Sequence, residues 1–101
     1  GSLGGLYNGA GHTIVSADMT LTPGVEGYGA QANSATAAVD TKYDVISNTV
    51  GGLELNTNPL FSNTVAVTDE DTTVRFKAAM SGSTVAGKYS DTVYYTVTPN
   101  L

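Results

Sequence analysis

Few side chains in this chain of 101 residues can do acid–base or nucleophilic chemistry. The sequence contains one histidine, His12, no cysteine and nine acidic residues. A Ser–His–Asp site needs a serine held in a specialised turn beside the histidine, and no serine here lies in a nucleophile-elbow motif. His12 borders a glycine-rich stretch, which is typical of an exposed or strand-edge histidine. We therefore predict no catalytic residues and no enzymatic activity.

The only acidic cluster is Asp69-Glu70-Asp71. Calcium prefers several carboxylate and carbonyl oxygens, and a calcium site in this run is one hypothesis. An EF-hand loop instead places its acids at alternate positions, followed by a glycine and a distant glutamate, and the run does not have that spacing. We interpret the cluster as a solvated turn and predict no metal site and no cofactor.

Two further groups of residues could in principle bind phosphate or form a covalent crosslink. Gly51-Gly52 lacks the Lys-Ser of a phosphate-binding loop and is interpreted as a hairpin turn. A buried lysine can form an amide with an asparagine or aspartate side chain, and Lys77 with Asn100 is the pair that we consider. Lys77 alternates onto a polar face, so we expect no such crosslink.

Charge patterning excludes two classes of partner. Charged residues make up 13% of the chain and its net charge is −5, with Arg75 and Lys77 as the only close basic pair. Nucleic acids and anionic membrane surfaces need clusters of lysine and arginine, so we predict that the chain binds neither. No apolar run reaches the roughly 18 residues that a membrane-spanning helix requires, so we predict no membrane insertion by this segment.

The elements that would position any site are β-strands. Glutamate, glutamine and lysine, which favour helices, are scarce, whereas threonine, which favours strands, is abundant. Alternation of apolar and polar residues predicts about seven strands, with reversals at Pro23-Gly24 and at Gly51-Gly52 that would form two local hairpins. The expected strands are 12–22, 25–32, 43–50, 53–55, 64–68, 73–80 and 89–98.

This pattern predicts one all-β domain, an antiparallel immunoglobulin-like β-sandwich spanning residues 13–101. Residues 1–12 are expected to form a flexible glycine-rich arm, in which Gly1-Ser2 is typical of an expression-tag remnant. The predicted core is formed by the inward residues of the alternating segments. They are Val15, Met19, Leu21, Val74, Phe76, Met80, Tyr89, Val93, Tyr95 and Val97.

The segment 73–100, and above all Ala86-Gly-Lys-Tyr-Ser-Asp-Thr-Val-Tyr-Tyr-Thr-Val-Thr98, resembles the closing strands of bacterial surface modules of immunoglobulin-like build. Such endings occur in pilin-like, fibre and adhesin domains. The resemblance implies a non-enzymatic structural or adhesive module of an extracellular surface protein, such as the globular domain of a pilin-like subunit. It implies a protein or glycan partner at the cell surface, or self-assembly into a fibre.

Two alternatives belong to other classes. In a carbohydrate-binding module, Tyr94 and Tyr28 would provide flat faces on which sugar rings stack. In a phage or viral structural domain, the same strands would form part of a particle. Neither alternative requires catalytic, cofactor-binding or metal-binding residues, and none is predicted.

Overall fold

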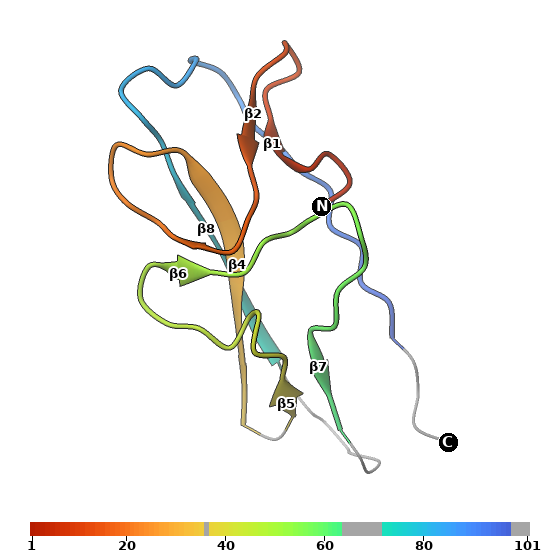
Figure 1. Cartoon of the computed structure of the whole chain (residues 1–101). Helices are drawn as coiled ribbons and strands as arrows, with labels where there is room; N and C mark the ends of the chain where they lie inside the picture. Colours follow the sequence, from red (N-terminus) through yellow and green to blue (C-terminus); the bar gives the residue numbers. More distant parts are fainter. Residues whose placement is uncertain (36, 64–71, 98–101) are drawn as a thin grey trace.

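The computed structural model describes residues 1–35, 37–63 and 72–97, and these residues form an all-β fold with antiparallel sheets and no helix (Figure 1). The strands are short except for two, and each of the named sheets has two strands. The strands are β1 (Gly5–Tyr7), β2 (Thr13–Val15), β3 (Met19–Thr20), β4 (Gly27–Ser34), β5 (Ala38–Val39), β6 (Thr49–Val50), β7 (Phe61–Ser62) and β8 (Thr72–Ala79).

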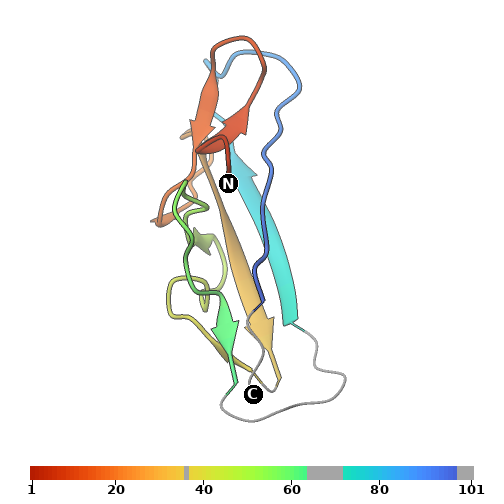
Figure 2. The ribbon, with the colours of Figure 1, turned by 90° about the vertical axis from the view of Figure 1, so that its right-hand side faces the viewer.

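The two long strands, β4 and β8, form the spine of the molecule. They pair antiparallel over eight residue pairs, from Gly27 opposite Ala79 to Ser34 opposite Thr72. Because alternate side chains of a strand point to opposite faces, Tyr28, Ala30 and Ala32 share one buried face of β4. Figure 2 shows this ladder running along most of the length of the described chain.

The second edge of β4 is bound by three segments that are not continuous strands. Ala30 and Gly51 exchange two backbone hydrogen bonds of 2.9 and 2.8 Å, and the Ala32 amide donates to the Tyr43 carbonyl at 2.8 Å. Ser16 and Tyr28 form a parallel bridge, in which the Ser16 hydroxyl also donates to the Tyr28 carbonyl. These contacts make β4 the central strand of the fold.

Small hairpins and ladders surround the spine (Figure 1). The β1–β2 hairpin lies at one end, with Leu6 opposite Ile14, and the β5–β7 pair lies at the other. The β3–β6 pair, with Met19 opposite Val50, lies beside β4. Residues 1–12, which were predicted to form a flexible arm, contain β1 and so contribute a strand to the structure.

The buried core differs from the predicted one. Of the ten predicted residues, Leu21 is buried and Val15, Phe76, Met80, Tyr95 and Val97 are exposed. The remaining four, Met19, Val74, Tyr89 and Val93, are half-buried. Alternation assigned each of the five exposed residues to the inner face of a strand, on the assumption that a second layer of the fold covers that face completely. The side chains that cover β4 come instead from the segments around residues 14, 43 and 50, and leave much of β8 uncovered. The observed core is Ile14, Leu21, Tyr28, Ala30, Ala32, Tyr43 and Val50.

Local hairpins were the second incorrect expectation. The turn at Pro23-Gly24 is present, with the Val25 amide donating to the Thr22 carbonyl at 3.0 Å and Gly24 at a φ of 88°. The strands beside this turn do not pair with each other, because β3 pairs with β6 and β4 with β8. Gly51-Gly52 is likewise no hairpin turn, since Gly51 pairs with Ala30.

Five predicted strands have other outcomes. The strand predicted at 12–22 is divided into β2 and β3, the one at 43–50 is a strand only at β6, and 53–55 forms no strand. The segment 64–68 lies outside the described residues. The segment 89–97 has no strand ladder with the described residues. It forms an isolated bridge between Ser90 and Tyr7, and its Thr92 carbonyl accepts from the Ser2 amide. The strand predicted at 73–80 is confirmed as β8, and that at 25–32 as β4, each within two residues.

We predict that Gly29→Ala destabilises the fold severely. A Cβ atom at Gly29 would lie 2.5 Å from Val50 Cγ2 and 2.6 Å from the Gly51 carbonyl oxygen, and the latter, a backbone atom, cannot move aside cheaply. Overpacking of this kind costs about 1–3 kcal/mol. Gly82→Ala is the matched control, because a Cβ atom there meets nothing within 4 Å. Urea denaturation should separate the two variants, and equal midpoints would contradict the close approach of β4 to residues 50–51.

Candidate functional site

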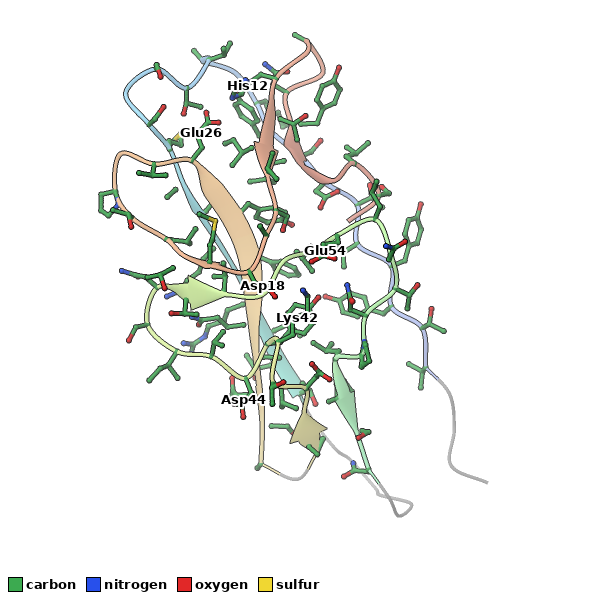
Figure 3. All side chains as sticks on the ribbon, in the orientation of Figure 1. His12, Asp18, Glu26, Lys42, Asp44 and Glu54 are labelled. Carbon is green, nitrogen blue, oxygen red and sulfur yellow. The ribbon has the colours of Figure 1, made fainter. Side chains whose placement is uncertain are left out.

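Among the described residues, one charged cluster brings together Lys42, Asp18 and Glu54 (Figure 3). The Lys42 ammonium donates to Asp18 Oδ1 at 2.7 Å and to Glu54 Oε1 at 2.9 Å. The Gly52 amide also donates to Asp18 Oδ1, at 2.7 Å. The Lys42 side chain is only 16% exposed, whereas the two carboxylates face solvent more openly. We call these three residues the Lys42 cluster.

Three separate segments position the Lys42 cluster. Asp18 precedes β3, Glu54 follows the Gly51-Gly52 pair, and Lys42 lies in a turn closed by the carbonyl of Asp40, which accepts from the amides of Tyr43 and Asp44. The Asp40 carboxylate accepts from the Lys42 amide at 3.1 Å and fixes the same turn. The cluster therefore fastens together parts of the chain that the sequence separates.

The charges of the Lys42 cluster reinforce one another. The hydrogen bond from the Gly52 amide, together with the Lys42 ammonium, lowers the pKa of the Asp18 carboxyl below its ordinary value of 3.8. Burial of Lys42 acts to lower the pKa of its ammonium, but the carboxylates of Asp18 and Glu54 outweigh burial and raise the pKa. Lys42 and Asp18 thus remain ionised at neutral pH. A charged ammonium has no lone pair with which to attack a carbonyl carbon.

A second cluster joins His12, Glu26 and Thr84. His12 Nε2 lies 2.8 Å from Glu26 Oε2, and the Thr84 hydroxyl donates to the same oxygen at 2.6 Å. The hydrogen bond from Thr84, followed by that from His12, lowers the pKa of the Glu26 carboxyl. The His12 ring also meets the Tyr89 ring edge-on, at 6.1 Å between centroids.

The geometry of the second cluster is not that of a catalytic triad. In a triad the imidazole accepts the hydroxyl proton, whereas here the carboxylate accepts from both the hydroxyl and the imidazole side. The arrangement holds the β1–β2 loop, the residue before β4 and the 81–84 turn in one place. His12 is half-buried and directly precedes β2, so it lies at a strand edge. Sequence reasoning missed Glu26 because no spacing pattern links residues 12, 26 and 84.

The remaining residues considered from the sequence do not converge with these clusters. Tyr94 is 79% exposed, but Tyr28 is buried and offers no free ring face, so that the pair cannot form a stacking platform. Burial, with a further contribution from the Asp91 charge, raises the pKa of Tyr28 to about 12. Asp69-Glu70-Asp71 and Asn100 lie outside the described residues.

The described ranges offer a shallow depression and no cluster of metal-binding side chains. These ranges contain no group of three or more His, Asp or Glu side chains placed to hold a metal ion, and no helix long and apolar enough to cross a membrane. A shallow depression of about 560 Å³ is lined by Leu21, Pro23 and Met80 among others. Its ionisable side chain, Lys77, donates to the Ser47 carbonyl at 2.6 Å and serves the fold.

Comparison with known proteins adds no relative: no family model, curated protein or solved structure matches this chain.

We predict that Asp18→Asn destabilises the protein by about 0.5–1 kcal/mol at neutral pH, the upper part of the range of an exposed ion pair. The folded state lowers the pKa of Asp18, so its stabilising effect is complete above pH 3.8 and is lost as the pH falls through the lower, folded-state value. The difference between the variant and the parent should therefore shrink in acid. Denaturation at a series of pH values measures it.

Asp44→Asn is the matched control for this measurement, because the Asp44 carboxylate has no hydrogen-bond or ion-pair partner among the described residues (Figure 3). It should change the free energy of unfolding by less than about 0.5 kcal/mol. If both variants lost the same stability at every pH, the Lys42 cluster would not be a stabilising contact.

We also predict that no side-chain amide crosslink forms at Lys42, although the structure brings this lysine into contact with two carboxylates. The reason is that the Lys42 ammonium is charged and has no lone pair for attack. Intact-mass spectrometry of the denatured protein should give the mass of the sequence without deficit. A loss of one water would contradict this prediction and would indicate an amide between Lys42 and a carboxyl group.

Proposed function

We propose that this chain is a non-enzymatic structural or adhesive module of a bacterial extracellular surface protein, of the kind found as the globular domain of a pilin-like subunit. The proposal includes an immunoglobulin-like arrangement, in which the small sheets around β4 and β8 belong to the two layers of one β-sandwich of about seven strands. The module would act by contact with other proteins rather than by chemistry at a pocket.

The observation that carries the proposal is the combination of an unpaired strand edge with exposed apolar side chains. On the side away from β4, β8 forms no backbone hydrogen bond to another described residue. Met80, Tyr94 and Val97 are 64%, 79% and 84% exposed. Unpaired edges and exposed apolar side chains are the surfaces through which β proteins join other chains.

Composition and shape give further support. With 13% charged residues and many threonines, the surface is polar but weakly charged, as is common in extracellular β proteins. The molecule is elongated, with extents of 48, 25 and 19 Å, which suits a unit that spans distance. The sugar-binding alternative is weakened, because Tyr28 is buried and leaves Tyr94 without its proposed partner.

Surface labelling tests this proposal in the organism that encodes the chain. An antibody raised against the folded domain should stain intact cells, and brief protease treatment of those cells should remove the stain. A cytoplasmic protein of the same organism, probed in parallel, is the control for cell integrity. Staining that appears only after the cells are permeabilised would contradict the proposal.

A further inference from the structure

The edge of β8 is the longest unpaired backbone edge in the described part of the chain. β8 has eight residues, and its ladder with β4 occupies one side only. In a two-stranded antiparallel ladder, alternate residues of each strand direct their amide and carbonyl groups outward. The outer side of β8 thus presents a row of donors and acceptors without partners among the described residues, which is the template for adding another strand.

A second segment of the same chain, residues 93–97, resembles a strand in sequence but has no paired strand beside it. Residues 90–92 are fixed beside the N-terminal segment by hydrogen bonds between Ser90 and Tyr7 and from the Ser2 amide to the Thr92 carbonyl. Beyond them, residues 93–97 form no backbone hydrogen bond to any described residue. This segment alternates in the manner of a strand, as Val-Tyr-Tyr-Thr-Val, and Tyr95 is 59% exposed.

Residues 93–97 have the composition of a good strand but lack a ladder. Valine, tyrosine and threonine are the residues that pair most favourably across strands. A five-residue strand is of ordinary length and fits within the eight residues of β8. Figure 2 shows the segment extended along the same direction as β4 and β8, at the surface of the molecule.

Charge disfavours one partner for the edge of β8, namely a second copy of β8. β8 carries Arg75 and Lys77, two of the four basic residues of the chain, and no acid. Two copies of β8 placed edge to edge would bring these like charges together, which is unfavourable. Residues 93–97 carry no charged side chain, so they meet no like charge at this edge. A different segment of a second copy is therefore favoured over a second β8.

We propose that residues 93–97 of one copy pair with the outer edge of β8 of a second copy. This inference rests on the proposed function as a structural module and names its partner as the protein itself. Because the donor segment and the acceptor edge are different surfaces, the contact is heterologous. Each joined copy still offers one free donor and one free acceptor, so that the contact propagates into an open chain or closes into a ring.

Sedimentation velocity of the purified domain over a wide concentration range tests the pairing. The parent protein should associate as the concentration rises towards millimolar. Proline lacks an amide hydrogen, and the amides of neighbouring strand residues point to opposite sides. Of the variants Tyr95→Pro and Thr96→Pro, one should weaken association about tenfold or more, which corresponds to the loss of about one backbone hydrogen bond. The other should weaken it less.

Thr57→Pro is the matched control, because Thr57 is also exposed and its amide has no partner among the described residues. It should associate like the parent. Circular dichroism verifies that each variant is folded. A parent protein that stays monomeric at all concentrations, or two segment variants that associate as well as Thr57→Pro, would overturn the inference.

Hydrogen exchange of the unmodified protein locates the contact without any variant. Amides of β8 and of residues 93–97 should become better protected as the concentration rises. Association that leaves the exchange of β8 unchanged would overturn the inference. Failure of self-association together with surface staining of intact cells would remove this pairing and leave the proposed function standing, whereas staining only of permeabilised cells would remove the function itself.

Discussion

The close approach of residues 50–52 to β4 is the constraint on which the rest of the fold depends. Ala30 and Gly51 exchange two hydrogen bonds at this point, and Gly29 leaves the space that Val50 fills. Gly52 lies against the backbone of Ala17, where a Cβ atom would come within 2.8 Å of the Ala17 Cα. Three glycines thus allow three backbone segments to meet, where any larger residue would keep them apart. The Lys42 cluster and the buried Tyr43 ring are both placed by this meeting point.

The sequence predicted the kind of structure well and the partners of its strands poorly. Alternation in 73–80 located β8 because Thr, Val, Arg and Phe there follow one another with a period of two. The turn at Pro23-Gly24 was predicted from another local signal, the turn preference of Pro-Gly, and Gly24 has the positive φ that such a turn uses. Pairing depends instead on contacts between distant segments, such as Gly27 with Ala79, and no local pattern records these contacts. A turn between two strands therefore did not imply a hairpin.

The candidate sites follow the same division. The lone His12 was visible in the sequence because it is the single histidine, and the acidic cluster because its three acids are consecutive. The Lys42 cluster was not, since Asp18, Lys42 and Glu54 lie on separate segments and each has an ordinary local context. Phe76 was assigned to the core from alternation alone, but alternation shows only which residues share a face. Whether another layer covers that face depends on the rest of the chain, and here Phe76 is 48% exposed.

The sequence separation of β4 and β8 also determines when their ladder can form during synthesis. β4 ends at residue 34 and its partner begins at residue 72, so that during synthesis the central strand emerges long before the strand that completes its ladder. Pairing between such distant segments is slow, because a long loop must close before any contact rewards the closure. Until residue 79 has left the ribosome, β4 has no β8 to pair with. From the synthesis of residue 34 until that of residue 79, the central strand therefore lacks its longest partner.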